Sequence, residues 1–264
     1  MHITSLYIYP IKSLGGISLQ LANLLKRGLE FDRRWMLVDS DGVFLTQRQI
    51  PDLALFSLKM EENQILVYSK LTGSEVRISI IPEGQKECMV KVWGDEVSAV
   101  EVSTNVSAWF TNEIGKPTRL VYMPDNSERL IDPNYTHNAE IVSFADGYPV
   151  LVTNEASLTE LNSRLKQSIE MNRFRPNIVI AGEEPFEEDD WKTVSIGNAQ
   201  LNLVKKCARC VMVNINPKTA IMEKEVLTAL ANFRKKDNKV YFGINGYALK
   251  SGIVGIGDKI KIGL

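Results

Sequence analysis

Short apolar segments that alternate with turn residues fill the first hundred residues of the chain. We predict strands at residues 3–9, 35–38, 43–46, 65–68, 76–81 and 89–93. Asp39-Ser40-Asp41-Gly42 separates two of these segments and predicts a hairpin. Short strands at intervals of roughly ten residues are typical of a barrel or a sandwich. The first part of the chain is therefore predicted to be a β-structure.

Residues that can begin or end a helix occur after the first hundred residues. Ser103 or Thr104 can cap a helix that ends at Gly115, and Thr153 or Asn154 can cap a second helix. We predict a third helix at 225–233 and further strands at 177–181, 199–214, 243–249 and 259–262. A polar, proline-containing loop at 125–138 suggests a boundary near residue 121, which gives domains of 1–121 and 122–264. The expected fold class is α+β and β-rich.

Composition narrows the class of protein. With 44% hydrophobic and 24% charged residues, the 264-residue chain resembles ordinary globular proteins and can bury a large core. A net charge of −1 argues against a general nucleic-acid or membrane-surface binder. We find no signal peptide and no apolar segment near the roughly 20 residues that span a bilayer. We therefore expect a cytoplasmic protein without nucleic-acid or membrane partners.

Two of the three cysteines stand in the basic run Lys205-Lys206-Cys207-Ala208-Arg209-Cys210. Neighbouring cations favour the thiolate form of cysteine, which binds metals and attacks electrophiles. Because the flanking residues predict an extended strand, Cys207 and Cys210 should point to opposite faces. This arrangement favours a single thiolate ligand over a redox disulfide.

Other chemistries remain open for this cysteine pair. A structural zinc site needs four ligands, and only Cys88, His2 and His137 could complete it. A thioredoxin-like dithiol requires the pair at a helix start, whereas apolar alternation continues past Cys210. Two structural thiols in a small-molecule-binding barrel are a further alternative.

Basic and polar motifs recur along the chain in a fixed order. They are Tyr9-Pro10-Ile11-Lys12-Ser13, Asp32-Arg33-Arg34-Trp35, Asn154-Glu155-Ala156-Ser157-Leu158, Phe174-Arg175-Pro176-Asn177-Ile178, Cys207-Ala208-Arg209-Cys210 and Asn216-Pro217-Lys218-Thr219. Together they resemble MOSC-domain proteins that carry an N-terminal β-barrel domain, the group of the mitochondrial amidoxime reducing component and its bacterial relatives. The resemblance runs nearly end to end. It implies an N-terminal β-barrel-like domain followed by a MOSC β-barrel with flanking helices.

The resemblance also implies a cofactor, molybdenum on a pyranopterin (molybdopterin). Cys210 matches the family's metal ligand and would be the catalytic residue. The matching cofactor-binding residues are Lys12, Ser13, Arg33, Gly147, Tyr148, Arg175, Asn177, Ala208, Arg209 and Cys210. Lysine offers a point charge and arginine a bidentate fork, so both suit an anionic cofactor. Pyridoxal phosphate binding is also ascribed to the family, but molybdopterin is the cofactor that we expect.

The implied reaction is reduction of the N–O bond of small N-hydroxylated compounds. Since no cysteine follows Cys210, electrons would come from a separate ferredoxin-, flavodoxin- or cytochrome b5-like protein. Tyr148 is bulkier than expected at its position and could narrow the pocket. The alternative is a non-catalytic carrier of sulfur or molybdenum cofactor, with a persulfide on Cys210.

Other conspicuous residues receive structural interpretations. We expect the acidic run from Glu183 to Asp190 to be a solvated loop, with a docking surface for an electron donor as the alternative. His137 is interpreted as a surface residue, with a place at the site mouth as the alternative. The tryptophans are expected to anchor the core or its edge; they are Trp35, Trp93, Trp109 and Trp191.

Overall fold

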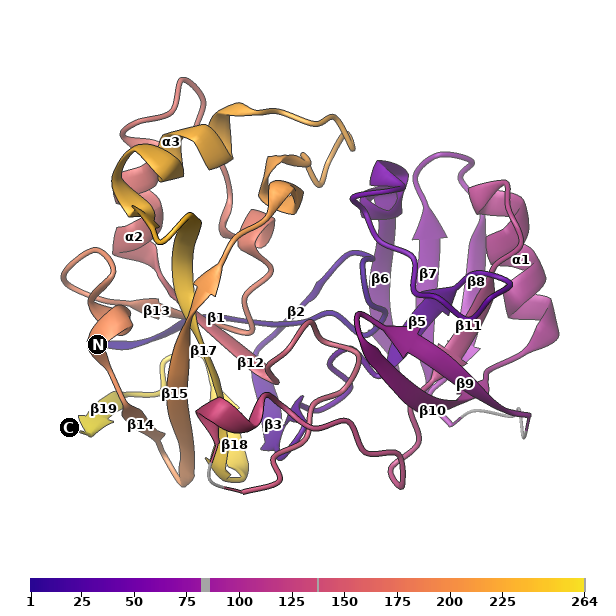
Figure 1. The fold of residues 1–264 in the computed structure, drawn as a ribbon, viewed down its shortest axis with the longest axis horizontal. Coiled ribbons are helices and arrows are strands. Elements are labelled where there is room, and N and C mark those ends of the chain that lie inside the picture. The colour runs from indigo at the N-terminus through magenta and orange to yellow at the C-terminus, as the bar shows by residue number, and fades with distance from the viewer. Residues whose placement is uncertain (82–85, 137, 264) are drawn as a thin grey trace.

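The computed structural model describes residues 1–81, 86–136 and 138–263. Two β-rich parts lie side by side (Figure 1). One part holds the longest sheet, and the other holds two smaller sheets with one helix. The chain passes between the two parts more than once.

The longest sheet has the strand order β19-β14-β15-β17-β12-β13-β1-β2, with β16 paired to β17. Its strands are β1 (His2–Ile8), β2 (Ile17–Leu19), β12 (Val150–Asn154), β13 (Ile178–Ala181), β14 (Thr193–Ile196), β15 (Ala199–Ala208), β16 (Lys235–Lys236), β17 (Lys239–Lys250) and β19 (Ile260–Gly263). Neighbouring strands are antiparallel except β12 and β13. The alternating apolar side chains of β1 and β15 contribute Ile3, Leu6 and Leu201 to its core.

The second part contains one sheet of order β5-β11-β10-β9 and another of order β6-β7-β8. Their strands are β5 (Trp35–Val38), β6 (Phe56–Glu61), β7 (Gln64–Ser69), β8 (Glu75–Ser79), β9 (Glu87–Val92), β10 (Asp95–Glu101) and β11 (Arg119–Tyr122). Trp35, Phe56 and Phe110 are fully buried between these sheets and α1 (Thr104–Ile114). The α+β, β-rich fold class is confirmed.

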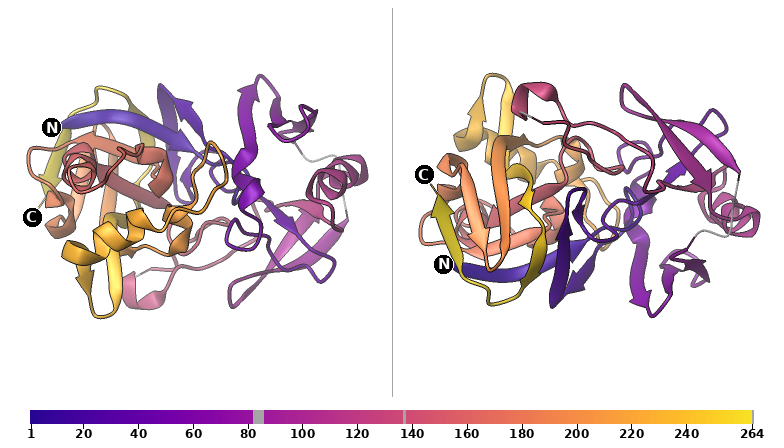
Figure 2. Two further views of the ribbon diagram at one scale, coloured as in Figure 1. Left: turned by 90° about the horizontal axis from the view of Figure 1, so that it is seen from above. Right: turned by 90° about the horizontal axis from the view of Figure 1, so that it is seen from below.

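The start of the chain contacts both parts, since Ile11 bridges Trp35 of β5 in the second part. β1 and β2 belong to the longest sheet, and β3 (Leu21–Leu25) pairs with both β4 (Gly28–Leu29) and β18 (Gly252–Gly255) (Figure 2). The start of the chain thus pairs with strands from its far end. The division into domains at residues 121 and 122 stays a prediction.

The helices begin and end where local sequence signals place them. Asn154 caps α2 (Glu155–Asn162), since its side chain accepts a hydrogen bond of 2.9 Å from the Ala156 N–H. Gly115 ends α1 with a left-handed φ of 75°. The third helix is α3 (Glu225–Arg234). In the part of the chain that the structure describes, no helix is long and apolar enough to cross a membrane.

Two predicted strands differ from the structure. Residues 43–46 form isolated bridges, Val38 to Phe44 and Val43 to Lys91, instead of a strand. The strand expected over 199–214 ends at Ala208, which still pairs with Tyr241 of β17 after an irregularity at Cys207. A 3₁₀ helix, η5 (Val211–Asn214), follows at once. The other 3₁₀ helices are η1 (Pro51–Leu55), η2 (Pro133–Tyr135), η3 (Met171–Phe174) and η4 (Glu187–Asp190).

Candidate functional site

A cleft of about 800 Å³ lies between the two parts of the molecule. All ten residues predicted to bind the cofactor line it, namely Lys12, Ser13, Arg33, Gly147, Tyr148, Arg175, Asn177, Ala208, Arg209 and Cys210. They come from the chain start, the 145–148 loop, the entrance to β13 and the end of β15. The fold therefore gathers in one place residues that are up to 198 positions apart in sequence, from Lys12 to Cys210.

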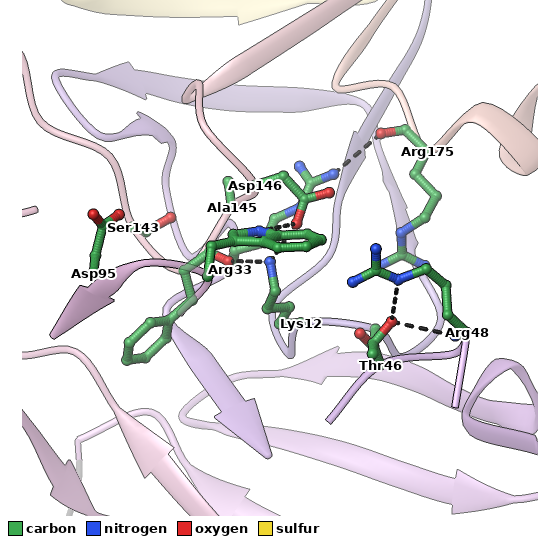
Figure 3. Close-up of polar contacts among 12 residues, drawn as sticks. Lys12, Arg33, Thr46, Arg48, Asp95, Ser143, Ala145, Asp146 and Arg175 are labelled. Carbon is green, nitrogen blue, oxygen red and sulfur yellow. Dashed lines mark hydrogen bonds and ion pairs between the residues drawn. The ribbon is translucent and has the colours of Figure 1, made fainter. Parts of the chain in front are cut away.

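Lys12 lies in the floor of the cleft. Its Nζ donates to the Phe144 carbonyl at 2.7 Å and to Asp146 Oδ1 at 2.6 Å (Figure 3). Burial lowers the pKa of Lys12, and the charge of Asp146 opposes that shift. The Asp146 side chain is 70% exposed, and the charge and hydrogen bond of Lys12 hold its pKa well below its usual range. This ion pair keeps a charged lysine at a site that penalises charge.

Two arginines enclose the ring of Tyr9. The guanidinium carbons of Arg33 and Arg175 lie 4.4 and 4.2 Å from the ring centroid. Arg33 is anchored by Asp32 at 2.5 Å and Asn177 Oδ1 at 3.1 Å, and it donates to the Arg175 carbonyl at 3.1 Å (Figure 3). Burial and the neighbouring charge of Arg33 lower the pKa of Arg175 to about 10. The cleft therefore carries positive charge that its own carboxylates do not fully balance.

The Asn177 side chain links β1 to β12 in the wall of the cleft. The side chain is 1% exposed; it donates to the Tyr7 carbonyl at 3.2 Å and accepts from the Leu151 N–H at 3.1 Å. Its neighbour Arg175 has a left-handed φ of 53°, and the side chain donates to the Leu14 carbonyl at 2.6 Å. These contacts fix the strand entrance at the cleft.

The two cysteines lie on either side of the end of β15. Cys210 is exposed and caps η5 with extended backbone, whereas Cys207 is half-buried in the bulge of β15. Both border the cleft, as do all residues from 204 to 210, so the prediction that the two side chains point to opposite faces stays a prediction. Arg209 lies between them, and it donates to Cys207 Sγ at 2.9 Å and to the Phe174 carbonyl at 2.8 Å. Cys207 is thus an acceptor that holds Arg209, and Cys210 offers the more accessible sulfur.

The remaining predicted residues contribute mostly backbone. Ser13 adopts a left-handed φ of 71°, and its hydroxyl donates to the Leu45 carbonyl at 3.1 Å. Gly147 faces open space, since a Cβ there would meet no atom within 4 Å. Burial raises the pKa of Tyr148, and the nearby Asp132 carboxylate adds to this. Ala208 is exposed at the end of β15.

Two side chains that the sequence did not assign to the site also line the cleft. Trp93 is 47% exposed with a left-handed φ of 57°, and its ring packs against Phe44 of the core, so it lies at the edge of the core. The guanidinium carbon of Arg48 lies over the Trp93 ring, 4.3 Å from the ring centroid. Apart from Arg48, further cations at the cleft are Arg173, Lys205, Lys206, Arg234, Lys235, Lys236 and Lys239. Three carboxylates accompany them, from Asp146, Asp189 and Asp237.

The acidic run is only partly solvated. Glu188 is fully buried in η4 and accepts a long hydrogen bond from Ser157 Oγ, 3.4 Å from Oε1. Asp189 pairs with Lys206 at 3.1 Å and with Arg234. The expectation of a solvated loop was therefore wrong for these two residues, because η4 turns them inward. His137 lies outside the described residues.

Comparisons with known proteins agree with this architecture. Residues 1–117 match the MOSC N-terminal beta barrel domain, and residues 139–261 match the MOSC domain. Mitochondrial amidoxime reducing component 2 of Rattus norvegicus is 32% identical over 98% of this chain and 82% of its own length. The same-named protein of Bos taurus is 31% identical, with the same coverage.

A third relative is larger. The molybdenum cofactor sulfurase of Oryza sativa is 31% identical over 92% of this chain, which spans only 32% of that protein. The similarity to the rat and cattle proteins, together with the two matched domains, identifies the family. The chain belongs to the proteins that join a MOSC N-terminal β-barrel domain to a MOSC domain.

Proposed function

We propose that this protein is a molybdenum-cofactor-dependent oxidoreductase that reduces the N–O bond of N-hydroxylated compounds. The observation that carries the proposal is the exposed thiol of Cys210 at the edge of a cleft lined by cations from both parts of the chain. The MOSC family is associated with the molybdenum cofactor, and two relatives are named as amidoxime reducing components.

The residues of the cleft fit a pyranopterin with a terminal phosphate. A thiolate is a soft donor that suits a metal such as molybdenum. Burial lowers the pKa of Arg175, and among the described residues its guanidinium has no ion pair with a carboxylate. The Nε of Arg209 is buried and, among the described residues, has no hydrogen-bond partner. An anionic group with polar edges would satisfy these side chains.

The proposed roles follow from the positions. Cys210 would be the metal ligand and catalytic residue. Lys12, Arg33, Arg175 and Arg209 would hold the anionic and polar edges of the cofactor, assisted by Ser13 and Asn177. Gly147, Tyr148 and Ala208 would contribute backbone groups. When bound, the cofactor supplies the two-electron redox chemistry of the reaction.

The overall reaction needs two electrons and two protons, which convert an N–OH group to N–H and water. A separate ferredoxin-, flavodoxin- or cytochrome b5-like protein would supply the electrons. The protein's own part is to bind and orient the N-hydroxylated substrate in a cationic cleft.

Cysteine variants test the proposal. We expect wild-type protein from a cofactor-competent host to contain molybdenum and pterin and to reduce benzamidoxime with reduced methyl viologen. Cys210→Ala should lose at least about 100-fold of this activity, while Cys207→Ala, which only frees Arg209, should stay within about tenfold. Equal losses from both substitutions would contradict the assignment, as would folded wild-type protein without molybdenum.

The similarity to the rice molybdenum cofactor sulfurase favours a second candidate, a carrier of sulfur or molybdenum cofactor. This carrier would hold a persulfide on Cys210. Intact-mass spectrometry of the native protein distinguishes the two candidates. A reducible adduct of one sulfur on Cys210, without pterin and without N-hydroxy reduction, would support the carrier.

A further inference from the structure

We propose that Arg48, held against Trp93, binds the carboxylate or phosphate of an aromatic N-hydroxylated substrate. This inference rests on the proposed function and names its substrate class. Neither Arg48 nor Trp93 is among the residues assigned to the cofactor.

The charge of the cleft calls for more than one anionic group. Twelve lysines and arginines line the cleft against three aspartates, in a chain whose net charge is −1. The arginines assigned to the cofactor already have internal partners, as Arg33 has in Asp32 and Asn177. Arg48 differs from them, because its Nε contacts only Thr46 Oγ1, at 3.4 Å. Its terminal nitrogens have no hydrogen-bond or carboxylate partner within residues 1–81, 86–136 and 138–263.

The position of Arg48 is fixed by a chain of contacts. Its guanidinium lies 4.3 Å from the Trp93 ring centroid, and Trp93 Nε1 donates to Asp146 Oδ1 at 3.2 Å. Asp146 in turn accepts from Lys12 (Figure 3). Arg48 is therefore connected to the predicted cofactor wall but is not part of it. A guanidinium held in this way presents a fork that matches a carboxylate or a phosphate.

An aromatic surface adjoins this fork. Trp93 is 47% exposed, and the centroid of its ring lies 5.1 Å from the centroid of the Phe44 ring. A side pocket of about 410 Å³ shares Phe44, Thr46, Arg48 and Trp93 with the cleft. None of the ten residues assigned to the cofactor lines this side pocket. A planar group can therefore contact the rings while its anionic substituent binds Arg48.

Paired substrates test the inference. We would compare benzamidoxime with 4-carboxybenzamidoxime and 4-(phosphonooxy)benzamidoxime, using reduced methyl viologen as electron donor. The proteins would be wild type, Arg48→Gln, Arg48→Lys and the control Arg77→Gln, which changes an exposed arginine of β8 outside the cleft. The same compounds would be titrated calorimetrically into protein without electron donor, and pterin content would be measured for each variant.

We expect wild type and Arg77→Gln to favour an anionic substrate about tenfold or more in kcat/KM and in Kd. Arg48→Gln should abolish the preference without changing benzamidoxime reduction or pterin content, and Arg48→Lys should restore part of it. The better of the two anionic compounds identifies the group. A preference that persists in Arg48→Gln, no preference in wild type, or loss of pterin from Arg48→Gln would overturn the inference. If no compound is reduced, the proposed function fails, while the calorimetric preference still decides the role of Arg48.

Discussion

Glu188 gives a prediction about the pH dependence of stability. Its side chain is fully buried in η4, where burial raises its pKa from the ordinary value of 4.5 to about 7. A carboxyl whose pKa is higher in the folded state favours folding when protonated. This stabilisation is complete below pH 4.5, the ordinary value taken for the unfolded chain, and is lost as the pH rises through 7.

The magnitude follows from the shift. A rise from 4.5 to about 7 corresponds to about 3 kcal/mol of free energy of unfolding at 1.36 kcal/mol per pH unit. Glu188→Gln keeps the size of the side chain but removes the titration. At pH 8 the variant should therefore be more stable than wild type by up to about 3 kcal/mol, and this difference should shrink towards pH 5.

Urea unfolding monitored by circular dichroism between pH 5 and 8 measures the difference. Glu184→Gln is the matched control, because Glu184 belongs to the same acidic run and is exposed. Its stability should follow wild type at every pH. If Glu188→Gln were less stable than wild type at pH 8, Glu188 would act as a stabilising carboxylate, and the assignment of a protonated buried carboxyl would be refuted.

Two further predictions concern Asn177 in the wall of the cleft and Gly243 in β17. Asn177→Leu should destabilise the protein by about 2–4 kcal/mol in urea unfolding, because the Leu151 N–H and the Tyr7 carbonyl lose their buried side-chain partner and Arg33 loses one of its three acceptors. Asn63→Leu, at an exposed turn, should have little effect, and equal effects would contradict this role. Gly243→Ala should lower the free energy of unfolding by more than about 1 kcal/mol, since the φ of Gly243 is +77° and a Cβ would lie 2.7 Å from the Val152 carbonyl oxygen. Gly197 is also left-handed but faces open space, so Gly197→Ala should destabilise the protein less. Thermal unfolding measures both variants, and the reverse order would refute the steric explanation.

Local sequence signals predicted the helices well because caps act within a few residues. Asn154 begins α2 through a contact two residues away, and Gly115 ends α1 through a contact four residues away. The pairing of β3 with β18 could not be predicted in this way, because it joins residues more than 200 positions apart, such as Leu24 and Gly252. Such pairing depends on the whole fold.

The residues of the candidate site were likewise predictable only in part. Ordered motifs pointed to Lys12, Arg175 and Cys210, and the fold places them at one cleft. The prediction of a strand through Cys210 was wrong, because the apolar alternation of the sequence continues across a bulge and a 3₁₀ helix without a visible break. Arg48 and Trp93 were missed as site residues, since an exposed tryptophan with left-handed backbone has no local sequence signature.

The central claim is that the sulfur of Cys210 binds the metal of a cofactor held by the cations of the cleft. X-ray absorption spectroscopy at the molybdenum edge tests it most directly, on wild type, Cys210→Ala and Cys207→Ala. We predict one fewer sulfur neighbour of molybdenum in Cys210→Ala than in wild type, and no change in Cys207→Ala. An unchanged sulfur count in Cys210→Ala that still carries molybdenum would contradict the account.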